Sequence, residues 1–160
     1  MIRIIETLTE PAVSHARTLF REYSMSPEVQ VCLQDFELEI TSLPGFYGRP
    51  TGRLLLALHD GPVGHDAPVG CVGLRKIVEG TCEMKRLYVR PRFRNEGAGQ
   101  ALVENLIAEA RAMDYAKMRL DTLPIMREAQ TLYRKFGFVE IPAYAKNPTP
   151  NALCFELALR

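Results

Sequence analysis

The chain reads Arg90-Pro91-Arg92-Phe93-Arg94-Asn95-Glu96-Gly97-Ala98-Gly99 where an apolar strand pattern gives way to a helical one. Glycines allow a ligand to approach the backbone closely, and the first N–H groups of a helix are unpaired and lie at the positive end of its dipole. Together these features bind phosphate groups. Gly97-Ala98-Gly99 alone is more often a tight turn before a helix, but the arginines before it favour the phosphate-binding interpretation.

Two other phosphate-binding loops can be excluded on the same residues. A P-loop needs the pattern G-x-x-x-x-G-K-[ST], which the sequence lacks. A dinucleotide-binding turn needs G-x-G-x-x-G, but Leu102 stands at the position of the third glycine. The preceding strand also follows a run of strands and does not open a βαβ unit, so a nucleotide-dependent oxidoreductase is disfavoured.

The segments around this glycine turn predict a mixed fold. The helix after the turn has apolar residues at helical spacing, and the three strands before it, joined by short connections, predict antiparallel pairing. A strand and two helices open the chain, and a strand, a helix and two strands close it. We expect these elements at residues 2–5, 9–23, 29–42, 53–58, 69–78, 82–89, 97–113, 118–122, 126–136, 138–141 and 153–159. The expected order is β-α-α-β-β-β-α-β-α-β-β.

The composition is that of one globular domain over residues 1–160. Hydrophobic residues make up 47% of the chain and charged residues 24%, and no repeat or linker divides it. The formal net charge of +1 argues against a general nucleic-acid binder. The longest apolar run, Leu54 to Leu58, is far shorter than the ~18 residues of a membrane span. Arg3 and Glu6 interrupt the apolar start that a secretory signal would need.

The cysteines and histidines are scattered, without a C-x-x-C pair or a closely spaced His partner. They are Cys32, Cys71, Cys82, Cys154, His15, His59 and His65. Free thiols in a reducing compartment are favoured over a disulfide framework or a zinc site. We therefore expect a cytoplasmic protein without a metal site.

With these motifs, the sequence resembles the GNAT superfamily of N-acetyltransferases. Residues Arg94 to Gly99 match its acetyl-coenzyme A signature [RQ]-x-x-G-x-[GA], and Leu87-Tyr88-Val89 stands at its bulged central strand. Leu132-Tyr133-x-x-x-Gly137-Phe138 matches its late helix-to-strand motif, and the order of elements agrees along residues 2–159. Two positions depart from the pattern. Asn95 replaces a common glycine, and Met126 replaces an asparagine that contacts the cofactor in many members, which puts that contact in doubt.

The resemblance implies an α+β fold in three layers, with a central, mostly antiparallel twisted sheet of about seven strands and about four helices. It implies acetyl-CoA as the co-substrate and an acetyl transfer to a primary amine. Backbone N–H groups from Arg94 to Gln100 would hold the pyrophosphate, and the Leu87–Val89 backbone would pair with the pantetheine arm. Arg92 and Arg94 would meet the phosphates, although an exposed arginine without a ligand is an equal alternative for Arg92. The implied cofactor-binding residues are Leu87, Tyr88, Val89, Arg92, Arg94, Asn95, Glu96, Gly97, Ala98, Gly99 and Gln100.

Acetyl transfer needs one group that accepts the proton of the ammonium and one that donates to the leaving thiolate. Family members often carry a glutamate four residues before the position of Leu87, so the resemblance makes Glu83 the expected base; a salt-bridged structural carboxylate is the alternative. In a simple pleat, Glu83 shares a face with Lys85 and Leu87, and a bulge would change this parity. Tyr133 is the expected acid, against the alternative of a core tyrosine with a satisfied hydroxyl. No cysteine lies in a motif for an acyl-enzyme, so direct attack in a ternary complex is expected.

The acceptor is expected to be a small molecule with a primary amine, such as an amino acid. Two loops would build its site, and their candidate residues are Tyr47, Arg49, Tyr144, Lys146 and Asn147. Charged residues in such loops are more often simply solvated. Two alternatives stay open: a non-catalytic acyl-CoA-binding regulatory module of the same fold, and a peptide or protein N-acetyltransferase. The resemblance also makes a homodimer a candidate assembly.

The near-neutral net charge conceals a cationic segment. Lys85, Arg86, Arg90, Arg92 and Arg94 supply five of the chain's 20 lysines and arginines within ten residues. This segment leads directly into the glycine turn. It predicts that the protein binds one polyanionic cofactor without being basic overall.

Overall fold

The computed structural model describes residues 1–27, 29, 33–61, 66–145 and 150–160. These residues form seven strands and four α-helices in the order that the sequence predicts. The strands are β1 (Ile2–Glu6), β2 (Arg53–His59), β3 (Ala67–Val78), β4 (Thr81–Val89), β5 (Lys117–Thr122), β6 (Val139–Ile141) and β7 (Leu153–Ala158). The helices are α1 (Glu10–Ser24), α2 (Leu33–Thr41), α3 (Ala98–Ala112) and α4 (Arg127–Lys135), with the short 3-10 helices η1 (Gly45–Tyr47) and η3 (Pro91–Phe93). The second expected helix, 29–42, is described as α2 at Leu33–Thr41, and residues 30–32 of that expectation lie outside the described residues.

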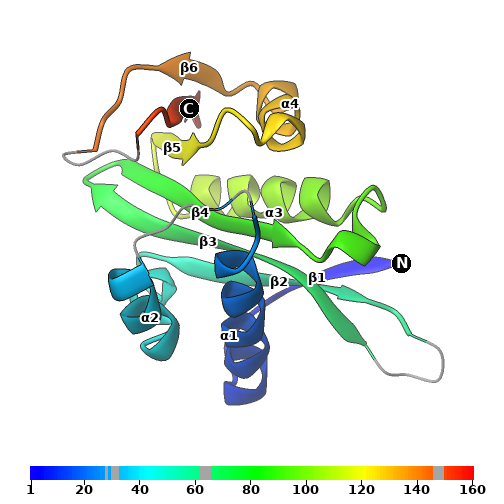
Figure 1. Cartoon of the computed structure of the whole chain (residues 1–160). Coiled ribbons are helices and arrows are strands. Elements are labelled where there is room, and N and C mark those ends of the chain that lie inside the picture. Colours follow the sequence, from blue (N-terminus) through cyan, green and yellow to red (C-terminus); the bar gives the residue numbers. More distant parts are fainter. Residues whose placement is uncertain (28, 30–32, 62–65, 146–149) are drawn as a thin grey trace.

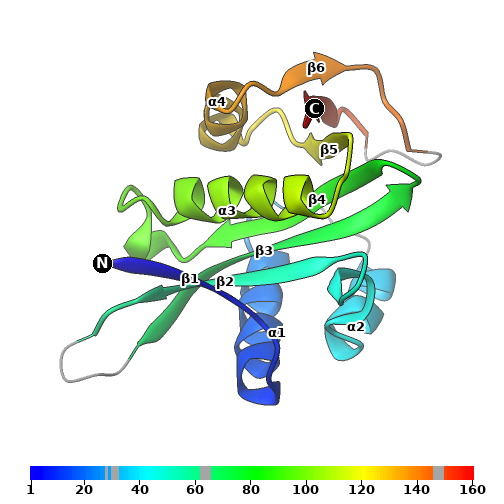
Figure 2. The same ribbon diagram turned by 180° about the vertical axis from the view of Figure 1, so that it is seen from behind.

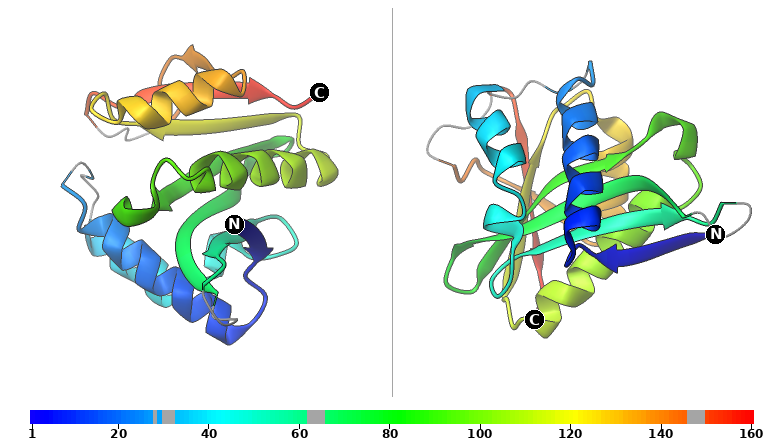
Figure 3. Two further views of the ribbon diagram at one scale, coloured as in Figure 1. Left: turned by 90° about the vertical axis from the view of Figure 1, so that its right-hand side faces the viewer. Right: turned by 90° about the horizontal axis from the view of Figure 1, so that it is seen from below.

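The strands form one sheet in the order β1-β2-β3-β4-β5-β7-β6. Every neighbouring pair is antiparallel except β4 and β5, which run parallel. Helices α1 and α2 cover one face, and α3 lies on the other (Figures 1 and 2). Figure 3 shows α4 with β5, β6 and β7 on one side of β4, and α1 and α2 on the opposite side. The three-layer, mostly antiparallel fold expected from the sequence is confirmed.

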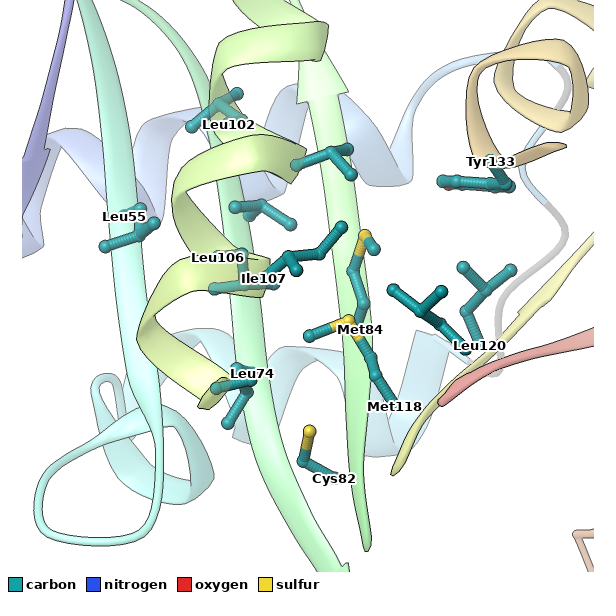
Figure 4. Close-up of a cluster of buried hydrophobic side chains, with 14 of the residues drawn as sticks. Leu55, Leu74, Cys82, Met84, Leu102, Leu106, Ile107, Met118, Leu120 and Tyr133 are labelled. Carbon is teal, nitrogen blue, oxygen red and sulfur yellow. The ribbon is translucent and has the colours of Figure 1, made fainter. Parts of the chain in front are cut away.

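Two apolar cores hold the layers together, one on each face of the sheet. The first core packs α3 and α4 against the strands, and Figure 4 shows Leu102, Leu106 and Ile107 of α3 within it. The second packs α1, α2 and η1 against the other face. Strand β2 serves both cores, because its side chains alternate between the first core and the second, which explains its continuous apolar run.

Local signals set the helix boundaries. Thr9 caps α1, since its Oγ1 accepts a hydrogen bond from the Ala12 N–H at 3.4 Å, and Pro11 lies in the first turn, as the sequence predicts. Helix α3 buries one apolar stripe and exposes its charged residues, which matches its helical spacing. None of the helices in the described part of the chain is long and apolar enough to cross a membrane.

Replacing Gly73 by alanine is expected to destabilise the protein. A Cβ at Gly73 would lie 2.6 Å from Cδ1 of the buried Tyr47 ring, so the ring would have to shift within the packed second core. We expect the free energy of unfolding to fall by about 1–3 kcal/mol, measured by urea denaturation. Gly99→Ala is the matched control, because its Cβ would meet Leu132 and Val89 only at 3.7 and 3.8 Å. Equal stability of Gly73→Ala and the wild type would contradict this packing.

Candidate active site

The glycine turn opens helix α3 with free amide donors. Gly97 is the N-cap with φ of 90°, a left-handed conformation that glycine adopts without strain, and it offers no side-chain cap. The first backbone bond of the helix runs from the Ala101 N–H to the Gly97 carbonyl at 3.0 Å. The first turn contains no acidic residue. The amides of Ala98, Gly99 and Gln100 therefore lie at an uncapped helix start that suits a phosphate group.

The turn before α3 explains one departure from the family pattern. Asn95 has φ of 66°, which glycine favours and asparagine tolerates better than other residues. Asparagine thus fits where glycine is common. Arg94 is exposed, and its Nε donates to the Val89 carbonyl at 2.9 Å, which ties the turn to the end of β4.

Only part of the cationic segment is free to bind an anion. Arg86 pairs with Glu39 at 2.8 Å, and Arg90 pairs with Glu22 at 2.7 Å. Lys85 Nζ lies 4.0 Å from Glu83 Oε1. Among the described residues, the arginines at 92 and 94 have no carboxylate partner. The two cations that the sequence assigns to phosphates are thus the two left without a counter-charge.

Strands β4 and β5 pair over three residues and then separate. Their parallel register runs from Thr81 opposite Lys117 to Glu83 opposite Arg119 and ends there. Beyond Glu83, β4 pairs only with β3 in the described part of the chain, so no described strand pairs with the Leu87–Val89 backbone on the β5 side. This split offers an unpaired strand edge where the sequence expects the pantetheine arm.

A bulge in β4 stands beside the split. Cys71 of β3 pairs with Tyr88 and Gly73 with Lys85, so β4 has one extra residue, and Arg86 has φ of 61°. The side chain of Arg86 is held from α2, since Nε donates to Glu39 Oε2 at 2.8 Å and the guanidinium carbon lies 4.5 Å from the Phe36 ring centroid. Helix α2 therefore fixes the bulge.

Two substitutions at Arg86 separate the side chain from the backbone strain. Both Arg86→Ala and Arg86→Gly leave the mostly buried Glu39 without its cation, which costs roughly 3 kcal/mol. Glycine accepts the positive φ, whereas alanine does not, so we expect the alanine variant to be less stable by about 1 kcal/mol more. Urea denaturation of both variants measures the difference. Equal stabilities would mean that the positive φ is not strained.

Glu83 lies where β4 and β5 separate, and its carboxylate is enclosed. Its side chain is buried, and the Arg75 Nε donates to Oε1 at 2.7 Å. The Tyr144 hydroxyl donates to Oε2. Burial raises the pKa of Tyr144, and the negative charge of Glu83 raises it further, so this hydroxyl stays protonated. The carboxylate is both ion-paired, as the alternative interpretation requires, and placed where the base is expected.

The expectation that Glu83 shares a face of the sheet with Lys85 and Leu87 is partly wrong. Cys82 and Met84 point into the first core, so Glu83 faces the side of α1 and α2, as Lys85 does. Leu87 packs against the first core, on the opposite face from Glu83. The bulge at Arg86 reverses the alternation after Lys85, which is why the simple pleat fails here.

Tyr133 projects from α4 toward the first core beside β4 and β5 (Figure 4). Its ring is buried, yet among the described residues its hydroxyl has no hydrogen-bond partner. Burial raises the pKa of Tyr133, and the charge of Asp121 raises it further. No described residue satisfies this hydroxyl, and the role of Tyr133 as the acid stays a prediction.

Of the two loops expected to build the acceptor site, only the later one is seen to reach Glu83. Tyr144 reaches Glu83, and the guanidinium carbon of Arg119 lies 5.3 Å from the Tyr144 ring centroid. Residues 146 and 147, also expected at the acceptor site, lie outside the described residues. The loop after α2 was also expected at this site through Tyr47 and Arg49, but the structure places these two residues elsewhere.

Tyr47 belongs to the second core. It is 1% exposed, and its hydroxyl donates to Glu39 at 3.0 Å. Arg49 pairs with Glu6 at 2.7 Å, and that ion pair lowers the pKa of Glu6. Both residues line a pocket of about 270 Å³ at the start of α1 that does not include Glu83. The exposed aromatic of the loop is Phe46, whose ring centroid lies 5.9 Å from the Arg75 guanidinium carbon.

Three further residues join the site without having been predicted. Arg75 holds Glu83, and Lys135 Nζ donates to the Gln100 Oε1 at 2.9 Å beside the start of α3. Asp121 lies on β5 just past the split. Met126, which replaces the common asparagine, precedes α4, and its sulfur accepts a hydrogen bond from the Thr122 hydroxyl at 3.6 Å.

The described cysteines are free and buried. Cys154 lies opposite Asp121 on β7, near the site, and burial raises its pKa. A thiolate is thereby disfavoured at neutral pH. Within the described residues, no three His, Cys, Asp or Glu side chains gather as a metal ion would require.

Comparisons with known proteins agree with this geometry. The chain matches the family model described as "Acetyltransferase (GNAT) family" over residues 15–138. It is 34% identical to an uncharacterised N-acetyltransferase of Schizosaccharomyces pombe over 144 residues, which cover 89% of this chain and 86% of that protein. It is 33% identical to the IAA acetyltransferase of Azospirillum brasilense over 113 residues, which cover 69% of this chain and 71% of that protein.

A solved structure shares the whole fold. The GNAT-family acetyltransferase of Staphylococcus aureus matches with a TM-score of 0.83, and the match covers 100% of both chains. The sequences are 19% identical, so this likeness concerns the fold.

Proposed function

Because the chain belongs to the GNAT acetyltransferase family, we propose that it transfers the acetyl group of acetyl-CoA to a primary amine of a small molecule. The observation that carries the proposal is the split between β4 and β5, with an enclosed carboxylate where it begins and an uncapped helix start beyond it. Transfer would occur by direct attack in a ternary complex. The raised pKa of Cys154 supports direct attack over an acyl-enzyme.

The residues present fit acetyl-CoA, which supplies an acetyl thioester when bound. Amides at the start of α3 and the unpaired Arg92 and Arg94 suit the pyrophosphate and phosphate groups. The free edge of Leu87–Val89 suits the pantetheine arm, whose amides can pair as a strand does. Met126 would contribute no amide hydrogen bond to the cofactor, so the backbone contacts would have to suffice.

Glu83 and Tyr133 would move the two protons. Glu83 accepts the ammonium proton, through water because its own oxygens are engaged by Arg75 and Tyr144. Tyr133 donates its free hydroxyl hydrogen to the sulfur as negative charge develops there. The two side chains belong to opposite faces of the sheet at the split, so we place the acceptor amine and the thioester between them.

Release of free CoA thiol in the presence of a panel of primary amines tests the proposal. The panel contains alkylamines, amino acids and short peptides, and Glu83→Gln serves as the impaired variant. We expect thiol release that depends on a small amine and falls in Glu83→Gln. Release with peptides alone would favour a peptide N-acetyltransferase. CoA binding by calorimetry without release on any amine would favour a non-catalytic acyl-CoA-binding module.

A further inference from the structure

Asp121 shares the split with Glu83 but stands on the other strand. On β5, Met118 and Leu120 point into the first core, so the alternating Arg119 and Asp121 face the side of Glu83. Arg119 is the last residue of β5 that pairs with β4, and Asp121 lies two residues further, ~7 Å along the strand. The two carboxylates therefore lie on one face, one on each strand where the strands separate.

The charges on this face leave Asp121 as the carboxylate without a cation. Arg75 pairs with Glu83 at 2.7 Å, and Arg119 pairs with Glu156 at 2.8 Å. Within the described part of the chain, Asp121 makes no hydrogen bond or ion pair. It is half-buried, so its charge is only partly solvated. Such a carboxylate attracts a cation.

The same carboxylate acts electrostatically on the tyrosines around the split. The charge of Asp121 raises the pKa of Tyr133 on one side and of Tyr144 and Tyr23 on the other, in addition to burial. Tyr133 therefore lies within the electrostatic reach of Asp121, although the two side chains belong to opposite faces of the sheet. A cation bound by Asp121 would lie on the Glu83 side of the sheet, where β4 and β5 separate.

We propose that Asp121 binds the ammonium group of the acceptor and makes the enzyme selective for charged alkylamines. This inference rests on the proposed function. Both oxygens of Glu83 are already engaged, so an incoming ammonium reaches Asp121 without displacing a partner, and Glu83 then accepts its proton through water. Alkylammonium groups, like lysine with a pKa of about 10.4, are almost fully charged at neutral pH. Neutral amines lack this attraction.

Binding of hexylamine and of hexanol to the CoA-saturated protein, followed by NMR saturation transfer, tests the inference without requiring turnover. We expect the wild type to prefer hexylamine, and Asp121→Asn to lose that preference at least tenfold. Asp121→Glu should restore part of it. Asp114→Asn is the control, because Asp114 pairs with Arg160 far from the split.

The kinetic readout separates this inference from the proposed function. In thiol release, Asp121→Asn should raise the KM for the alkylamine at least tenfold and leave the KM for acetyl-CoA unchanged. A wild type that prefers hexylamine but never releases thiol would contradict the proposed function alone. Equal hexylamine binding by Asp121→Asn and the wild type would overturn the role of Asp121, and so would a wild type that binds hexanol as well as hexylamine.

Discussion

Tyr133→Phe is expected to lower kcat for acetyl transfer by about 100-fold or more, with little change in either KM. A well-placed proton donor contributes about 10²- to 10⁴-fold, and the substitution removes only the hydroxyl. Because burial raises the pKa of Tyr133, the wild-type hydroxyl should stay protonated through neutral and mildly alkaline pH. Steady-state thiol release measures the effect.

Tyr115→Phe is the matched control for this variant. Tyr115 is also buried in the first core, but its hydroxyl donates to the Thr51 carbonyl at 2.6 Å, away from the split. We expect this control to lose about 1 kcal/mol of stability and to keep its kcat. Undiminished turnover in Tyr133→Phe would remove Tyr133 from the reaction.

Gln100→Glu is expected to raise the KM for acetyl-CoA at least tenfold while leaving the protein as stable or more stable. A carboxylate in the first turn of α3 interacts favourably with the helix dipole, worth about 0.3–1 kcal/mol, and it can pair with Lys135. The same carboxylate would repel a pyrophosphate bound at the helix start and neutralise Lys135. The variant should therefore bind acetyl-CoA more weakly in steady-state kinetics, while its midpoint of thermal unfolding stays the same or rises.

Gln100→Met is the uncharged control, which separates the effect of the added charge from the effect of losing the glutamine side chain. It removes the hydrogen bond from Lys135 but adds no charge and keeps every backbone amide. We expect its KM for acetyl-CoA to stay within a few-fold of the wild type, whereas Gln100→Glu departs strongly. A wild-type KM in Gln100→Glu would show that no phosphate lies at the start of α3.

Much of this fold is readable from local patterns. The run at Leu54–Leu58 predicts a strand buried on both faces, and the glycine turn predicts the start of α3. The family resemblance placed a bulge in β4, but only the structure locates it at Arg86 and shows that α2 holds it through Glu39. A positive φ at arginine has no signature in one sequence, because it depends on a tertiary partner.

The residues at the site were harder to predict, because strand register and loop packing determine which side chains lie there. A two-residue turn at Glu79-Gly80 would place Lys76 opposite Glu83, but an irregularity in β3 places Arg75 there. Tyr47 and Phe46 are adjacent aromatics in one loop, and only packing against Gly73 decides that Tyr47 is buried. Asp121 gave no signal, since its role depends on where β4 and β5 separate.

Parallel measurement of released thiol and acetylated amine, by mass spectrometry of the reaction mixture and of the protein, tests the central claim most directly. We predict equal amounts of thiol and N-acetylated amine and an unmodified protein throughout turnover. Acetyl groups that accumulate on the protein would contradict direct attack. Acetyl-CoA that stays intact with every amine tested, although CoA binds, would contradict the assignment of an amine acetyltransferase.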